Sequence, residues 1–218
     1  MLSVAEEKVS RRAIAKEHRR QQLIDATIKC ISKKGLGSTT LGDVAREAGL
    51  SQGIVNLHFN SKDNLLAETL RYLAEEYDEQ FMQTLKKSPP NPAARLSALM
   101  QMDFKPAVCE PKKLAVWFAF WGEVKAVPTY RKICADRDQK YDNIIRGLVK
   151  DIIREGGYEG RDAITVADAL SSLTDGMWLS CLINPKTFDR TTAWNAVSSY
   201  LSAMFPDHYC PQPVETES

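Results

Sequence analysis

The chain has 218 residues, a formal net charge of +1 and 44% hydrophobic residues. At about 100–200 residues per domain, this length suits a small module joined to a larger one. The five cysteines include no CxxC spacing, and the longest apolar runs are shorter than the roughly 18 residues that span a bilayer, so neither a disulfide framework, a zinc site nor a membrane protein is indicated.

The beginning of the chain is basic although the whole chain is nearly neutral. Residues 1–62 contain eleven lysines and arginines against six acids, whereas residues 63–218 contain eighteen against twenty-two. Basic residues before or within the first predicted helix are Arg11, Arg12, Lys16, Arg19 and Arg20. Two interpretations stand side by side: a basic arm that contacts phosphates or a minor groove, and a solvated leader. The first residues have no apolar core, so we expect no secretory signal and a cytoplasmic protein.

Three helical patterns follow one another before residue 60. Residues 16–34 predict a first helix that ends at Gly35. A short second helix, capped by Thr40, is predicted from an apolar stripe at i, i+3, i+4 and i+7, formed by Leu41, Val44, Ala45 and Ala48. Gly49 supplies the backbone freedom that a sharp turn needs, and Ser51 is a good N-cap for the third helix. This is the layout of a helix-turn-helix.

The third predicted helix, residues 52–59, has one face suited to DNA. Val55 and Phe59 point inward at i and i+4, which leaves Gln52, Gly53, Asn56, Leu57 and His58 facing outward. Small and hydrogen-bonding side chains suit contacts with base edges in a major groove, and Leu57 either contacts thymine methyl groups or packs against the protein. We expect phosphate contacts from Thr39, Thr40 and Lys62.

These residues resemble the N-terminal DNA-binding domain of the TetR family of bacterial repressors. The similarity runs from Arg20 to Leu66, and its most specific part is the segment GLSQGIVNLHFNSKDNLL. The family pattern at the end of the recognition helix is matched here by Leu57, His58, Phe59 and Lys62. The resemblance implies binding to double-stranded operator DNA. Many members carry an aromatic residue where this chain has Asn56, so the contact at that position differs.

The rest of the chain predicts helices only. The expected fold is all-α, with an N-terminal three-helix helix-turn-helix domain followed by a larger helical ligand-binding and dimerisation bundle. A long helix capped by Ser61 is predicted at 62–87, and further helices at 92–104, 111–126, 129–155, 162–183 and 190–204. The expected domains are residues 1–62 and 63–207, followed by a flexible tail at 208–218.

All four tryptophans lie in the C-terminal half of the chain. The candidate ligand-binding residues, on two predicted helices, are Trp117, Phe118, Trp121, Asp175 and Trp178. Aromatic faces beside carboxylates can form a cage for a cation, worth about 2 kcal/mol for a desolvated contact. The alternative for each aromatic residue is a place in the core, and a buried Asp175 would need a partner.

The segments WFAFW and LTDGMWL are similar to segments of TetR members related to BetI, the choline-responsive repressors. This resemblance implies a sensor domain of that subgroup. It also implies a small-molecule effector such as a quaternary amine or a polyamine.

A homodimer is expected because one recognition helix contacts only a few base pairs, and two of them about 34 Å apart fit a two-fold symmetric site. The family pairs its last two long helices into a four-helix bundle. In the matching segments, the candidate dimerisation residues are Leu170, Met177, Trp194, Val197 and Leu201. The alternative is a monomer in which both stripes contribute to one core.

The function expected from these features is a homodimeric repressor that leaves a palindromic operator when its effector binds, with the helix at 62–87 as the lever. The effector must favour the geometry that does not bind DNA. The alternatives are an all-helical enzyme or ligand carrier, and an adaptor whose helix-turn-helix does not bind DNA. Since the histidines at 18, 58 and 208 are scattered and no phosphate-binding loop is present, we expect no catalytic residue, metal site or cofactor, and no membrane partner.

Overall fold

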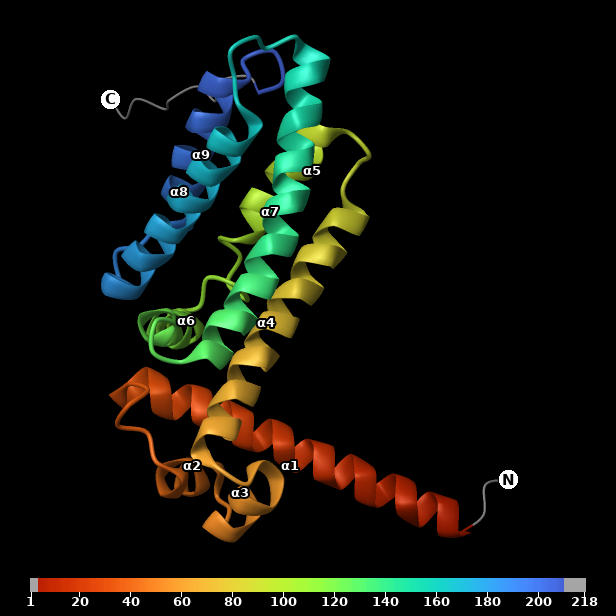
Figure 1. Ribbon diagram of the computed structural model, residues 1–218, viewed down its shortest axis with the longest axis vertical. Helices are drawn as coiled ribbons and strands as arrows, with labels where there is room; N and C mark the ends of the chain where they lie inside the picture. The colour runs from red at the N-terminus through yellow and green to blue at the C-terminus, as the bar shows by residue number, and fades with distance from the viewer. Residues whose placement is uncertain (1–3, 210–218) are drawn as a thin grey trace. The chain divides into compact units, whose positions relative to one another are not determined.

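The computed structural model describes residues 4–209, with side chains from residue 13 onward. Over that range the chain forms nine helices and no strand (Figure 1). The helices are α1 (Val4–Lys34), α2 (Leu41–Ala48), α3 (Gln52–Phe59), α4 (Lys62–Lys87), α5 (Pro92–Met102), α6 (Pro111–Glu123), α7 (Pro128–Gly156), α8 (Ala163–Ile183) and α9 (Arg190–Met204). The predicted all-α fold is confirmed, and α1 begins earlier than predicted. Within residues 4–209, no helix is both long and apolar enough to cross a membrane.

The chain divides into two compact units. The first comprises Met1–Leu73 and Ala115–Ile133, and the second comprises Ala74–Leu114 and Cys134–Ser218. Helices α4, α6 and α7 therefore contribute residues to both units. The predicted boundary after residue 62 was meant to divide a DNA-binding domain from a ligand-binding domain, which is a different division from that into compact units. It stays a prediction.

The helix-turn-helix of the first unit is built on a small apolar core. Leu23 and Ile24 of α1, Val44 of α2, and Val55 and Phe59 of α3 are each at most 1% exposed. Burial of such side chains contributes about 1.5–3 kcal/mol each, which is enough to fix three short helices against one another. Because α3 turns Val55 and Phe59 inward, its opposite side is left to the solvent.

Helix α2 begins with a capping box and ends at a left-handed glycine. The backbone N–H of Asp43 donates to Thr40 Oγ1 at 3.2 Å, and the backbone N–H of Thr40 donates to Asp43 Oδ2 at 3.1 Å. Gly49 has a φ of 65°, a region that favours glycine because a side chain would be strained there. The roles predicted for Thr40 and Gly49 are confirmed, and both ends of α2 are satisfied.

The predicted caps of α3 and α4 have different outcomes. Ser51 stands at the N-cap of α3 with extended backbone, but its side chain makes no capping bond, so that prediction is wrong in this detail. Ser61 Oγ accepts the backbone N–H of Asn64 at 3.1 Å, as expected for a cap of α4. The position of α3 therefore depends mainly on the packing of Val55 and Phe59.

The second unit is a helical bundle in which α8 and α9 run side by side (Figure 1). Its fully buried side chains come from several helices and from Phe205, which directly follows α9: Leu96, Leu99, Val149, Ile152, Leu170, Val197, Leu201 and Phe205. The packed part extends to Tyr209, whose hydroxyl donates to the carbonyl of Ala93 at 2.9 Å. The predicted tail therefore does not begin at residue 208, and residues 210–218 of that prediction lie outside the described residues.

Candidate functional site

The outer side of α3 is accessible as the sequence predicts. Gln52, Gly53 and Asn56 are exposed, and Leu57 is 73% exposed. His58 is half-buried. The five residues proposed to contact bases thus form one surface that is backed by a buried face of the same short helix.

Helix α1 brings positive charge close to that surface. Partial burial lowers the pKa of His58, and the charges of Lys16 and Arg19 lower it further. Lys16 and Arg19 are both exposed, on a part of α1 that precedes its buried segment. The imidazole and the two basic side chains therefore belong to one electropositive region of the first unit.

Another basic residue of α1 has a structural partner. Arg20 Nη2 forms an ion pair with Glu68 Oε2 of α4 at 2.6 Å, and both side chains are partly buried. This contact joins α1 to α4 within the first unit, so the guanidinium of Arg20 is already engaged by a carboxylate. The side chains of Arg11 and Arg12, also part of the predicted arm, lie outside the described residues.

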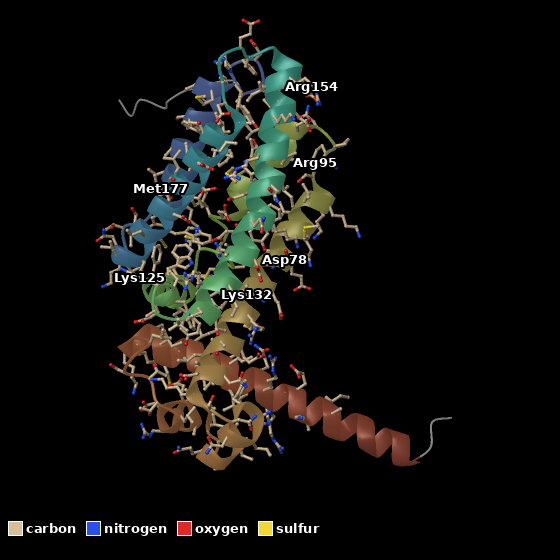
Figure 2. The ribbon with its side chains drawn as sticks, viewed as in Figure 1. Asp78, Arg95, Lys125, Lys132, Arg154 and Met177 are labelled. Atoms are coloured by element: carbon tan, nitrogen blue, oxygen red, sulfur yellow. The ribbon has the colours of Figure 1, made fainter. Side chains whose placement is uncertain are left out.

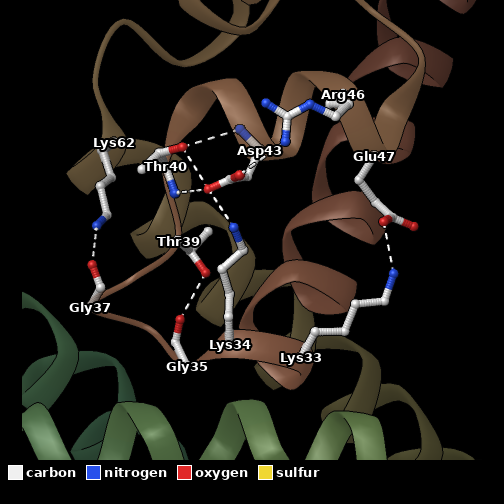
Figure 3. A network of polar contacts seen from close by, with 10 residues as sticks. All are labelled: Lys33, Lys34, Gly35, Gly37, Thr39, Thr40, Asp43, Arg46, Glu47 and Lys62. Atoms are coloured by element: carbon white, nitrogen blue, oxygen red, sulfur yellow. Dashed lines mark hydrogen bonds and ion pairs between the residues drawn. The ribbon is translucent and has the colours of Figure 1, made fainter.

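The loop before α2 is held by the residues predicted to contact phosphates (Figure 3). Thr39 is only 1% exposed, and its hydroxyl donates to the carbonyl of Gly35 at 2.8 Å. Lys62 donates from Nζ to the carbonyl of Gly37 at 3.0 Å. The structure therefore gives Thr39 a structural role, because a buried hydroxyl with a partner is not available to a phosphate. Thr40 is exposed and Lys62 is half-exposed.

The same loop is anchored by charge. Lys34 Nζ lies 2.7 Å from Asp43 Oδ2, and Lys33 Nζ lies 2.9 Å from Glu47 Oε2 (Figure 3). The hydrogen bonds from Lys34 and from Thr40 hold the pKa of Asp43 well below its usual value. Asp43 therefore remains ionised, and it ties the end of α1 to the start of α2.

The predicted ligand-binding residues fall into two groups. Trp117, Phe118 and Trp121 of α6 lie in the first unit, where the ring centroids of Trp117 and Trp121 are 6.2 Å apart and those of Phe118 and Trp121 are 5.0 Å apart. Asp175 and Trp178 of α8 lie in the second unit. Asp175 is exposed, so the condition under which it would need a buried partner is not met.

In the second unit, Asp103 connects three helices. It lies at the C-cap of α5 and is 4% exposed. Its Oδ1 accepts the hydroxyl of Tyr77 of α4 at 2.7 Å, and its backbone carbonyl accepts Nε1 of Trp178 of α8 at 2.8 Å. Trp178 is itself buried, so the indole has a structural role and both of its faces lie inside the bundle.

Two carboxyl groups in this region have raised pKa values. Burial raises the pKa of Asp103 to about 7, against the opposing effects of the Tyr77 hydrogen bond and of Arg137. Desolvation also raises the pKa of Asp175 to about 6, although the residue keeps an exposed surface, and Arg137 opposes the shift there too. Both groups therefore titrate near neutral pH and both interact with the same arginine.

Aromatic residues that the sequence analysis did not select complete this cluster. The ring of Tyr77 packs edge-on against Trp178, at 6.0 Å between centroids, and against Tyr141, at 5.1 Å. Tyr141 of α7 donates from its hydroxyl to Asp78 Oδ1 at 3.1 Å. Asp78 is labelled on α4 in Figure 2. Two sequence features could have indicated this cluster: Tyr77 within the apolar stripe of α4, and the pair Arg137 and Tyr141 at i and i+4 on α7. We call Tyr77, Asp103, Arg137, Tyr141 and Trp178 the central cluster.

Burial corrects the predicted dimer surface. Leu170, Val197 and Leu201 are 0% exposed in the single chain, so these three residues belong to its core, as the monomeric alternative assumed for both stripes. Met177 and Trp194 are half-exposed. Met177 also lines a surface cavity of about 290 Å³ between the end of α8 and the start of α9, together with Ser180, Asn184, Thr187, Phe188, Asp189, Thr192 and Ala193. Among the described residues, no group of three or more His, Cys, Asp or Glu side chains is arranged to hold a metal ion.

Two family descriptions match the chain. Residues 23–69 match the bacterial regulatory proteins of the TetR family, and residues 92–206 match the C-terminal domain of BetI-type transcriptional repressors. The HTH-type transcriptional regulator BetI of Paraburkholderia phymatum is 30% identical over 190 residues, which cover 87% of this chain and 94% of that protein. The protein of the same name from Paraburkholderia xenovorans is also 30% identical, over 85% of this chain and 93% of the relative.

Solved structures share the fold. A transcriptional regulator from Pseudomonas aeruginosa PAO1 has a TM-score of 0.77 and 27% identity, covering 90% of this chain and 95% of its own. A regulator from Saccharomonospora viridis in complex with choline has a TM-score of 0.76 and 21% identity, covering 85% and 96%. By these family descriptions and relatives, the chain belongs to the TetR family of bacterial transcriptional regulators.

Proposed function

We propose that the protein is a homodimeric repressor that binds a two-fold symmetric operator and leaves it when a small cation binds the second unit. The observation that supports DNA recognition best is α3, a short helix with two fully buried residues behind an exposed polar face. Its work on DNA would take place in the cytoplasm. Release follows if the cation binds more tightly to the geometry that does not fit DNA.

The proposed DNA contacts are divided between bases and phosphates. Gln52 and Asn56 are the candidates for hydrogen bonds to bases, because amide side chains can contact adenine through two bonds. Gly53 allows close approach, and Leu57 and His58 complete the groove-facing surface. Phosphate contacts are proposed for Thr40, Lys62, Lys16 and Arg19, whereas Thr39 is withdrawn because its hydroxyl is buried and bonded.

The proposed effector is a quaternary amine or another small organic cation. The central cluster offers aromatic rings, and the charge of Asp175 lies close enough to Asp103 to raise the pKa of that carboxyl group. Aromatic faces and carboxylates both attract cations. A structural relative holds choline, which supports this class of effector. Trp117, Phe118 and Trp121, which lie in the first unit, remain candidate ligand-binding residues of that unit by themselves.

Choline is expected to bind the full chain and to release it from operator DNA, with tighter binding at pH 8 than at pH 6. A bound cation favours ionised carboxylates, and the carboxyl groups of Asp103 and Asp175 have pKa values of about 7 and about 6. A carboxyl group that is protonated in the free protein must lose its proton when choline binds. The affinity for choline should therefore rise from pH 6 to pH 8, about twofold if only Asp175 contacts the cation and about 20-fold if both carboxyl groups do. Isothermal titration at the two pH values measures this change.

The control for this experiment is Asp175→Asn, which should weaken choline binding and remove its share of the pH dependence. DNA release is measured in parallel by fluorescence anisotropy of a labelled operator. If only apolar or anionic compounds release the DNA, the cation proposal is wrong. Equal choline affinity at pH 6 and pH 8 would exclude the two carboxyl groups as its partners.

The proposed surface for pairing is the exposed side of α8. Ile164 is 54% exposed, Leu179 is 42% exposed and Ile183 is 64% exposed, and these side chains lie on the side opposite the buried Leu170. Gly176 is also exposed, and a Cβ at this position would meet nothing within 4 Å, so the helix has room there for a close neighbour. These residues, together with Met177 and Trp194, are proposed as the pairing surface in place of the buried Leu170, Val197 and Leu201.

Leu179→Glu is expected to weaken self-association at least about tenfold, because pairing would then bury an unpaired carboxylate. The variant should still fold, since the side chain is exposed in the single chain, and its melting temperature should fall only as far as the lost pairing requires. Sedimentation equilibrium measures the change. Met82→Glu is the matched control, because Met82 is 41% exposed but lies on α4. A Leu179→Glu chain that sediments like the wild type would exclude this surface.

A further inference from the structure

The aromatic rings of the central cluster already hold a cation that belongs to the chain. The guanidinium carbon of Arg137 lies 5.3 Å from the centroid of the Tyr77 ring and 6.0 Å from that of Tyr141. Both distances are within the range of cation–π attraction, and only 12% of the Arg137 side chain is exposed. Arg137 therefore occupies the position over these rings that a cationic ligand would need.

The charges around Arg137 favour a cation at this position whichever molecule supplies it. Arg137 Nη2 pairs with Asp138 Oδ1 at 2.7 Å. It also lowers the pKa values of Asp103, Asp175 and Asp142, so its charge reaches all three carboxyl groups. Removing the guanidinium alone would leave two tyrosine rings and several carboxyl groups without a central positive charge.

We propose that Arg137 is an internal competitor for the effector site, and that the effector binds over Tyr77 and Tyr141 by displacing its guanidinium. This proposal rests on the proposed cationic effector and describes how that site is regulated. A trimethylammonium head and a guanidinium group each carry one positive charge that an aromatic face attracts, so one can replace the other over the same rings. The bound effector thus exchanges one cation–π contact for another rather than adding a new one.

The displaced side chain keeps a partner outside the rings. Asp138 is the next residue in the chain, and its side chain is 48% exposed, so Arg137 can turn toward solvent and retain the ion pair. A long arginine side chain allows this movement because its charged end lies at the end of a flexible stem. Competition of this kind reduces the apparent affinity to the intrinsic affinity multiplied by the fraction of molecules in which the site is open.

The experiment compares Arg137→Ala with the wild type in the full chain. Choline chloride and tetramethylammonium chloride are titrated calorimetrically, and anisotropy of a labelled operator is recorded in parallel samples. Arg137→Ala is expected to bind both cations at least about tenfold more tightly, because one desolvated cation–π contact no longer competes. Arg137→Lys keeps a positive charge over the rings, so its affinity for choline and for tetramethylammonium should be close to that of the wild type.

Arg154→Ala is the matched control on the same helix. Arg154 is 68% exposed and pairs with Asp151 in its own helix, so its loss should leave the affinity for both cations unchanged (Figure 2). If Arg137→Ala does not fold, as judged by thermal unfolding, Arg137→Met replaces it because methionine keeps an apolar stem against the tyrosine rings. The same tenfold gain is expected.

The outcomes separate the two proposals. If the wild type binds choline and releases DNA but the neutral variants bind equally or more weakly, Arg137 does not compete and the inference is wrong, while the proposed function stands. If neither the wild type nor the neutral variants bind either cation, both proposals are wrong. Tighter binding by the neutral variants, with Arg137→Lys near the wild type, supports the inference.

Discussion

Replacing Gln52 and Asn56 together by alanine is expected to lower the affinity for the operator at least about 100-fold. Each amide that makes a bidentate base contact contributes about 1–3 kcal/mol of discrimination, and the two side chains lie one turn apart on the exposed face of α3. Neither side chain is buried, so the melting temperature should not change. The measurement is fluorescence anisotropy with an operator selected from a random pool.

Binding to unrelated DNA serves as the internal comparison. The basic residues that contact phosphates remain in the double variant, so non-specific affinity and its dependence on salt should be preserved. Gln101→Ala is a matched control, because this exposed amide lies on α5. An equal loss of affinity for operator and for random DNA would mean that the two amides do not select sequence.

Phe59→Ala is expected to destabilise the first unit by about 3–5 kcal/mol and to abolish operator binding. Phe59 is 1% exposed at the end of α3, and its carbonyl accepts the side-chain amide of Asn64 at 3.0 Å. Without the ring, α3 loses one of its two buried contacts and its side-chain N-cap is absent, so the helix has little left to hold it. Urea unfolding followed by circular dichroism measures the loss.

Leu57→Ala provides the contrast on the same helix. Leu57 is 73% exposed, so this change should alter stability by no more than about 0.5 kcal/mol. Any effect on operator affinity then reports a contact with DNA, because the fold is unchanged. An unchanged urea midpoint for Phe59→Ala would contradict the idea that packing alone positions α3.

The helices could be predicted because their ends carry local signals. The capping hydrogen bonds of Thr40, Gly49 and Ser61 join residues only three or four positions apart, so the local sequence is enough to predict these helix ends. Proline and glycine pairs marked most of the other ends. Ser51 shows the limit of such signals, since a residue type suited to capping occupies the right position without making the bond.

The dimer stripe could not be predicted because periodicity identifies an apolar face but not what covers it. Leu170, Val197 and Leu201 satisfy the spacing expected for an interface, and the same spacing serves the core of their own unit. Only the position of neighbouring helices decides between the two. The exposed Leu179 and Ile183 lie on the other side of α8.

The central cluster was missed for a similar reason. Tyr77 and Asp103 are 26 residues apart, and Trp178 is 75 residues from Asp103. Local patterns contain no information about such pairs, since they depend on how α4, α5 and α8 pack. The spacing of Arg137 and Tyr141 on α7 is a local signal, but it does not indicate that the arginine is buried or that Tyr77 lies beside it.

The two bonds of Asp103 have a mechanical consequence for signalling. Its carboxyl group accepts a hydrogen bond from Tyr77 of α4, and its backbone carbonyl accepts one from Trp178 of α8. Because one residue makes both hydrogen bonds, a ligand that displaces Tyr77 must either move α8 as well or break one of these hydrogen bonds. Asp103 can thus transmit the displacement of Tyr77 by a ligand from α4, a helix that contributes to both units, to α8, the helix of the proposed pairing surface.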